Sequence, residues 1–151
     1  MEVRQATVDD LAGVAAVFIA SDRAPWTESA LAPRDDRIAY VALVDGRIIG
    51  AAKTHLHPEP DGDAPAGHYL GGLAVAPECR RQGVGSRLTR ARLDWIWARA
   101  ATTYYFTDER NTASIRLHQV LGFQPVARFE MIRGVTADHD GERLILFEAS
   151  R

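Results

Sequence analysis

The chain has 151 residues, 46% of them hydrophobic and 25% charged, enough for one substantial core, so we expect a single domain over residues 1–151. A net charge of −2 and a pI near 6.2 argue against a nucleic-acid partner, which would need a broad basic surface. The single cysteine, Cys79, excludes an internal disulfide, and the absence of a signal-like start or a long apolar run predicts a cytoplasmic protein without a membrane partner.

The N-terminal segment predicts a strand followed by a helix. Residues 2–6 form a β-type run, and Thr7 and Asp10 have capping-box spacing before the apolar run 11–20. Residues 21–33 then mix prolines, acids and Trp26, a composition typical of a loop or a short helix.

The next segment predicts an antiparallel hairpin. Residues 37–44 and 47–56 are β-type runs joined by Asp45-Gly46, a strong hairpin signal. Residues 58–66 are rich in proline and glycine and predict a surface loop. His55 and His57 share one strand face, but with no cysteine or third histidine nearby we expect no metal site.

Residues 67–75 predict a strand that contains the unusual pair Gly71-Gly72. Glycine weakens a strand and commonly marks a bulge or a close approach to the backbone. Either a ligand lies against this backbone, which we favour, or the glycines relieve crowding against the helices.

A basic loop, Arg80-Arg81-Gln82-Gly83-Val84-Gly85, separates this strand from a helical pattern over residues 84–100. Glycines let a backbone turn tightly, and the free amides at a helix start attract an anion. The loop matches neither the Walker pattern nor the dinucleotide pattern. We therefore predict a phosphate or pyrophosphate site of another kind.

The helical pattern itself has two apolar faces. One face, predicted to lie on the sheet, consists of Val84, Leu88, Ala91, Trp95 and Ala98. A second patch around Leu93 and Trp97 is expected to pack within the monomer, with a homodimer contact as the alternative. The remaining arginines are expected to form a solvated flank: Arg87, Arg90, Arg92 and Arg99.

The C-terminal third predicts a strand over 102–107, a helix that Asn111 caps and the glycine at 122 ends, and strands over 124–131 and 142–148. The acidic residues around His139 are expected to form a polar turn, with attraction of a cationic acceptor as the alternative.

Two blocks in this order resemble the GCN5-related N-acetyltransferases. The loop fits that family's acetyl-CoA signature [QR]-x-x-G-x-[GA], and the segments Leu73-Ala74-Val75-Ala76-Pro77 and 111–123 resemble its flanking strand end and second motif. The resemblance covers roughly residues 69–124. It implies an α/β fold with a mixed, mostly antiparallel sheet that is split at the centre and has helices on both faces.

The resemblance also implies where acetyl-CoA would bind. The pantetheine arm would pair with the strand backbone and the phosphates would lie on the loop, so the implied cofactor residues are Leu73, Ala74, Val75, Arg80, Arg81, Gln82, Gly83, Val84, Gly85, Ser86, Asn111 and His118. The segment that walls the acceptor pocket in the family corresponds here to residues 21–33, which makes Trp26 and Glu28 candidate substrate residues, with helix packing as the alternative for Trp26.

The implied chemistry is attack of a neutral amine on a thioester. The backbone N–H of Val75 would stabilise the oxyanion. His118 stands where the family usually has a tyrosine that acts as the general acid; it would either donate a proton or only pack against the cofactor sulfur. No carboxylate is assigned as the base, and Glu28, Asp22, His68 or a water chain are candidates. Cys79 lacks an arranged His and acid, so we do not expect an acetyl-cysteine intermediate.

The resulting prediction is an acetyl-CoA-dependent N-acetyltransferase of a bacterial small-molecule or aminoglycoside-like branch, which acts on a primary amine by direct attack in a ternary complex. The alternatives are a non-catalytic acyl-CoA-binding regulatory module and an acetyltransferase of protein N-termini or lysines.

Overall fold

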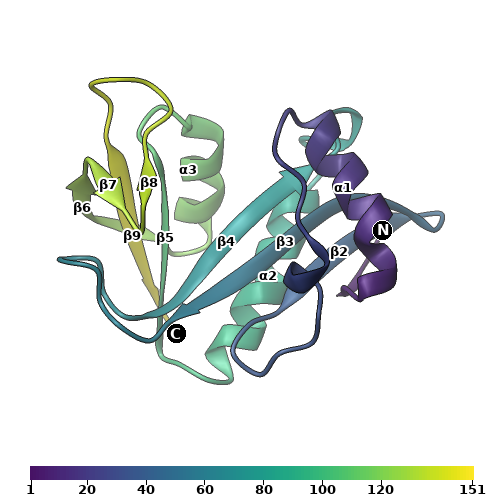
Figure 1. Ribbon diagram of the computed structural model, residues 1–151, viewed down its shortest axis with the longest axis horizontal. Coiled ribbons are helices and arrows are strands. Elements are labelled where there is room, and N and C mark those ends of the chain that lie inside the picture. Colours follow the sequence, from purple (N-terminus) through teal and green to yellow (C-terminus); the bar gives the residue numbers. More distant parts are fainter. The chain divides into compact units, whose positions relative to one another are not determined.

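The computed structural model describes residues 1–151 and has a mixed α/β architecture. Seven strands form one sheet in the order β1-β2-β3-β4-β5-β9-β6 (Figure 1). These strands are β1 (Glu2–Gln5), β2 (Ala39–Val44), β3 (Arg47–His57), β4 (Gly67–Val75), β5 (Thr102–Asp108), β6 (Gln124–Phe129) and β9 (Leu144–Ser150). The helices are α1 (Leu11–Ala20), α2 (Val84–Trp97) and α3 (Thr112–Val120), and β7 (Met131–Ile132) and β8 (Val135–Thr136) form a separate two-stranded ribbon.

The strand pairing is mostly antiparallel, as predicted. The pairs β1–β2, β2–β3, β5–β9 and β6–β9 are antiparallel, whereas β4 and β5 run parallel through Tyr69 and Tyr104. Contacts within the chain define two compact units. The first contains residues 1–55 and 70–95, and the second contains residues 56–69 and 96–151. The expected single domain stays a prediction.

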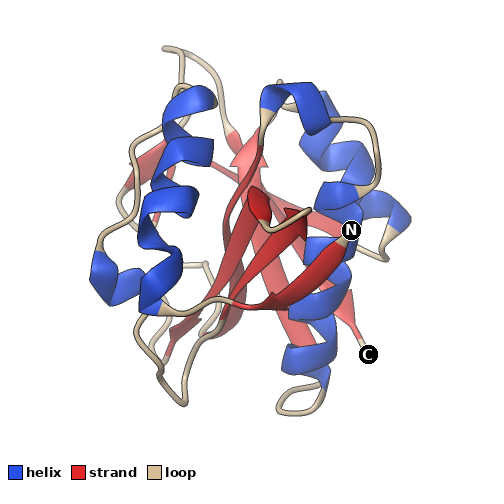
Figure 2. Ribbon diagram, turned by 90° about the vertical axis from the view of Figure 1, so that its right-hand side faces the viewer, coloured by secondary structure: helices blue, strands red, loops and turns tan.

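In the first unit, side chains on both faces of the strands are buried. Side chains alternate along a strand, so Val41 and Ala51 pack against α1, while Ala42 and Ala52 pack against Leu88 of α2. The two helices therefore lie on opposite faces of the same strands (Figure 2). This arrangement confirms the prediction of helices on both faces.

The start of α1 follows the predicted cap, with one difference. The Thr7 N–H donates to the Asp10 carboxylate at 2.8 Å, and a 3₁₀ turn, η1 (Val8–Asp10), precedes the α-helix proper. Arg4 also pairs with Asp10 at 2.8 Å, and its guanidinium holds the pKa of that carboxyl below the ordinary value. Strand β1 and the first helix are thus joined through one acidic side chain.

The hairpin between β2 and β3 forms as predicted. Asp45 has φ of 49° and Gly46 has φ of 76°, both in the left-handed region, and Val44 pairs with Arg47 across the turn. A two-residue loop of this kind matches the twist of antiparallel strands.

The second unit has its own core on β5, β9 and β6. Buried Tyr69, Leu144 and Leu146 pack there with Ile132 of the small ribbon. Strand β6 ends at Phe129 rather than at residue 131, because the chain then turns into the β7–β8 ribbon. The predicted loop over residues 58–66 contains one isolated bridge, between Asp61 and Ala64.

The packing of α2 follows the prediction in part. Leu93 and Ile96 of the second patch are buried, as expected for packing within the monomer, whereas Ala98 of the predicted sheet face lies beyond the end of the helix and is exposed. The prediction of a solvated flank is wrong for Arg92, which is 1% exposed.

Two carbonyls explain how Arg92 can be buried. Its Nη1 donates to the Gly71 carbonyl at 2.8 Å and to the Lys53 carbonyl at 3.1 Å, and its Nη2 donates to Thr89 Oγ1 at 2.8 Å. A buried guanidinium is stable when carbonyl acceptors replace its water. Arg92 thereby ties α2 to β3 and β4.

No helix of the structure is both long and apolar enough to cross a membrane.

Replacing Arg92 with methionine should destabilise the first unit. Methionine keeps the apolar stem but leaves the Gly71 and Lys53 carbonyls without their donor, so we expect Arg92→Met to lower the free energy of unfolding by about 2 kcal/mol. Urea denaturation followed by circular dichroism measures this change. Arg90→Met is the matched control, because Arg90 is exposed on the same helix and should change stability by less than about 0.5 kcal/mol. Equal effects of the two variants would contradict the bonding assigned to Arg92.

Candidate active site

The basic loop leads directly into α2 in the first unit. After a 3₁₀ turn, η3 (Pro77–Cys79), Arg81 has φ of 60° and Gly83 has φ of 81°, and the helix begins at Val84. A side chain at Gly83 would meet no atom within 4 Å. Glycine is therefore required at position 83 because of the backbone conformation there, and not because a side chain would be crowded. Gly85 already lies within α2, so only one of the two predicted turn glycines makes the turn.

This loop is suited to hold an anion. The first amides of α2 have no partner within the helix and lie at its positive dipole end, and Arg81 and Gln82 are exposed beside them. Arg80 is used differently, since its Nε donates to the Val75 carbonyl at 3.2 Å. Ser86 lies in the first turn of α2, as the sequence indicated.

The end of β4 presents backbone groups on the edge away from β3. Ala76 N–H donates to the Ile49 carbonyl of β3 at 2.8 Å. Because successive residues of a strand point their N–H and C=O groups to opposite edges, Val75 and Leu73 direct theirs to the other edge. Ala74, between them, is buried.

Side chains satisfy the carbonyls on that edge. The Val75 carbonyl accepts from Ser21 Oγ at 3.3 Å as well as from Arg80, and the Leu73 carbonyl accepts from Arg23. Ser21 and Arg23 follow the end of α1. Side-chain donors from the end of α1 and from the basic loop thus meet at this edge.

The glycine pair of β4 has a packing reason. A Cβ on Gly72 would lie 3.0 Å from the Trp26 ring, and a Cβ on Gly71 would lie 2.3 Å from the His55 ring. Of the two explanations that the sequence left open, the structure gives relief of crowding a physical basis. The crowding comes from a loop residue and a strand residue, not from the helices.

Trp26 lies against β4 and joins the core of this unit. Its ring packs 4.7 Å from the Phe18 ring, and Lys53 Nζ lies 4.6 Å from its centroid. Glu28 begins a 3₁₀ turn, η2 (Glu28–Ala30), and is exposed. Sequence reasoning missed Lys53, since a lysine inside a strand carries no signal of the ring it covers.

Asn111 belongs to the second unit and caps α3, as predicted. Its side chain accepts from the Ser114 N–H at 3.3 Å and donates to Thr107 Oγ1 at 3.2 Å. The cap fixes the point at which the chain leaves β5 and starts the helix.

His118, also in the second unit, is 2% exposed. Its ring stacks on Tyr105 with centroids 3.6 Å apart and contacts the edge of Phe123. Nδ1 lies 2.7 Å from the Ser114 carbonyl. Since a carbonyl only accepts, Nδ1 carries a proton and donates it to Ser114.

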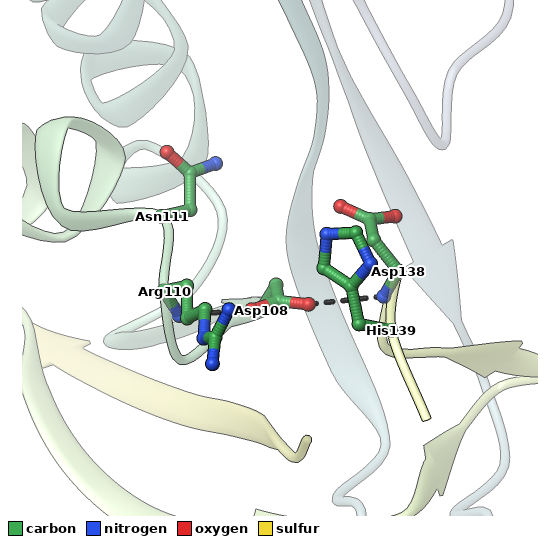
Figure 3. Close-up of a pocket in the computed structure, with 5 residues that line it drawn as sticks. All are labelled: Asp108, Arg110, Asn111, Asp138 and His139. Atoms are coloured by element: carbon green, nitrogen blue, oxygen red, sulfur yellow. Dashed lines mark hydrogen bonds between the residues drawn. The ribbon is translucent and has the colours of Figure 1, made fainter. Parts of the chain in front are cut away.

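A small pocket beside Asn111 is built around Asp108. Its carboxylate accepts from the Arg110 N–H at 2.8 Å and from the Asp138 N–H at 2.9 Å, with His139 on the far side (Figure 3). These N–H donors hold the pKa of Asp108 below its ordinary value. The carboxylate organises the loop, which agrees with the predicted polar turn. No group of three or more metal-ligating side chains occurs in the structure.

Comparison with known proteins identifies the family. Residues 7–123 match the acetyltransferase (GNAT) family, and the chain belongs to it. The enzymes of this family are acyltransferases that use acetyl-CoA.

An aminoglycoside N(6')-acetyltransferase type 1 of Klebsiella aerogenes is 34% identical over 103 residues, which cover 66% of this chain and 67% of that enzyme. A mycothiol acetyltransferase of Thermobispora bispora is 38% identical over 87 residues, which are 56% of this chain but only 29% of that enzyme. The chain thus spans less than a third of the mycothiol enzyme. The ribosomal-protein-S18-alanine N-acetyltransferase of Escherichia coli shares the fold, with a TM-score of 0.77 at 22% identity over 99% of this chain and 92% of that one.

The conformation of Gly83 generates a test of the loop. Alanine is strained at positive φ by about 1 kcal/mol. Gly83→Ala should therefore change the backbone conformation of the loop and weaken coenzyme A binding about fivefold. Isothermal calorimetry measures the affinity.

Gly46→Ala is the matched control. Gly46 also has positive φ, and a Cβ there also meets no atom within 4 Å, but it lies in the β2–β3 turn. This variant should lose similar stability and keep its coenzyme A affinity. A Gly83→Ala protein that binds coenzyme A as well as the wild type would argue against the loop as the phosphate site.

Proposed function

We propose that this protein transfers the acetyl group of acetyl-CoA to a primary amine of a small molecule. The observation that carries the proposal is the edge of β4, where the backbone groups of Leu73 and Val75 point away from β3 and the strand leads straight into the basic loop. An extended ligand with amides at one end and phosphates at the other suits this arrangement. Coenzyme A has that chemistry.

The proposed cofactor contacts follow the direction of the chain. The pantetheine amides replace the side-chain donors on the carbonyls of Leu73 and Val75. The pyrophosphate lies on the amides of residues 82–86 at the positive end of the α2 dipole, and Arg81 and Ser86 serve a phosphate beside it. The assignment of Asn111 of the second unit to the cofactor stays a prediction from the sequence, and the buried His118 is given a packing role instead.

The reaction is direct attack in a ternary complex. A neutral amine forms the N–C bond, the C–S bond breaks, the amine loses a proton and the thiolate gains one. The N–H of Val75 stabilises the negative oxygen that develops on the carbonyl. Cys79 Sγ has Arg47 Nη2 at 3.8 Å but no base among its recorded partners, which supports a route without an acetyl-cysteine.

In this proposal His118 is not the proton donor. Its Nδ1–H donates to the Ser114 carbonyl, and the ring is buried against Tyr105 and Phe123. We assign His118 to the packing of Tyr105 and Ser114. The thiolate then takes its proton from water, and water also removes the proton of the amine.

Release of free thiol from acetyl-CoA tests the function. We expect turnover with one class in a panel of amines: amino acids, aminoglycosides, polyamines and short peptides. Peptides as the preferred class would favour protein acetylation instead. Saturable acetyl-CoA binding without turnover of any amine would establish the binding-module alternative and reject the enzyme.

The role of His118 has its own prediction. His118→Phe preserves the stacked ring and should change kcat by less than about threefold with an unaltered pH profile, whereas loss of a general acid costs about 10²-fold or more. Gln119→Ala, at the exposed next position of α3, is the control. A large loss of kcat in His118→Phe alone, with normal thermal stability, would restore the proton-donor role.

A further inference from the structure

Positive side chains gather around Trp26 on the first unit. Lys53 Nζ lies 4.6 Å from the Trp26 ring centroid. Burial lowers the pKa of the Lys53 ammonium, and the charges of Arg37 and Arg23 lower it further. Lys53 pairs with Ala39 in the β2–β3 register, and Ile38 and Thr54 are hydrogen-bonded just beyond that pair, so Arg37 comes near the same part of β3.

Neither Lys53 nor Arg37 forms an ion pair with an acid. The ion pairs of the structure are formed by other residues, and no acid contributes to the lowered pKa of Lys53. Arg37 donates through Nη2 to the Ser29 carbonyl, and its Nε is buried with no hydrogen-bond partner. Asp36, the adjacent acid, pairs with Arg34 at 3.0 Å, and Arg34 lowers the pKa of Asp36 more than Arg37 does. The two cations are therefore only partly balanced by acids.

The cations flank the proposed reaction centre. Trp26 lies against Gly72, which precedes Val75 by three residues, or about 10 Å of extended strand. A small molecule of that length reaches from the Val75 N–H to the group of cations. Trp26 provides an apolar wall between the two ends.

We infer that the acceptor amine carries an anionic group, a carboxylate or a phosphate, which Lys53 and Arg37 bind beside Trp26. This inference rests on the proposed function and names its substrate class. An ammonium-rich acceptor, such as an aminoglycoside, meets like charges in the same place, and like-charge contact disfavours binding. The charge of Lys53 and Arg37 therefore separates the proposed substrate of this chain from the aminoglycosides for which its Klebsiella relative is named.

Matched amines that differ only in the charged group test the inference. The pairs are glycine and glycinamide, 4-aminobutanoate and 4-aminobutanamide, and 2-aminoethyl phosphate and ethanolamine, with kanamycin and spermidine as polycations. At a pH where each amine is corrected for its neutral fraction, we expect kcat/KM to favour the anionic member of at least one pair by about tenfold. The carboxylate and phosphate pairs show which anion the site takes.

Variants of single residues show which side chains cause the preference for an anionic amine. Lys53→Gln and Arg37→Gln should each reduce the ratio of kcat/KM between the anionic and neutral members about tenfold, mainly through KM. Arg90→Gln, which removes an exposed arginine of α2, should keep the wild-type ratio. Preference for kanamycin or for the neutral amines, or a ratio that Lys53→Gln and Arg37→Gln leave unchanged, would overturn the inference.

A binding measurement separates this inference from the proposed function. Calorimetry with N-acetyl-4-aminobutanoate, N-acetylglycine and N-acetyl-2-aminoethyl phosphate, in the presence of coenzyme A, should show binding of an anionic product that Lys53→Gln abolishes. Binding without turnover of any amine would reject the enzyme and keep the anion site. Turnover of amines without binding or preference for any anion would reject the anion site and keep the enzyme.

Discussion

The edge of β4 away from β3 is the constraint on which the rest of the site depends. Backbone carbonyls removed from water need donors, and at Leu73 and Val75 those donors are side chains from the end of α1 and from the basic loop. Strand pairing would close this edge permanently. In the proposed cofactor complex, the pantetheine amides replace these side-chain donors on the same carbonyls.

Arg92 supports β4 at the other end of the same segment. Its guanidinium binds the carbonyls of Gly71 and Lys53, so one buried charge fixes the glycine pair and the backbone of the lysine that covers Trp26. The packing of α2 on the sheet is thus linked to the position of the proposed acceptor residues. A charge in this position is tolerated because the Gly71 and Lys53 carbonyls and the Thr89 hydroxyl accept from its two Nη atoms.

The two halves of the proposed site use different physics. The phosphate end relies on backbone amides and a helix dipole, which need only a glycine with positive φ at the right place in the loop. The acceptor end relies on side chains from separate segments, so its charge and shape are properties of the packed unit. This difference explains why membership of the acetyltransferase family fixes the kind of reaction far more tightly than it fixes the acceptor.

The sequence by itself determined the order and type of the main elements, the Asp45-Gly46 turn, the Asn111 cap and the family, because each depends on short-range spacing, turn chemistry or a local motif. Only the tertiary structure decided that Arg92 is buried, that Gly71 and Gly72 make room for His55 and Trp26, and that Lys53 covers the Trp26 ring. In each case the deciding partner lies far away along the chain. Burial, crowding and unbalanced charge are set by such long-range neighbours, and periodicity within a segment carries no information about them.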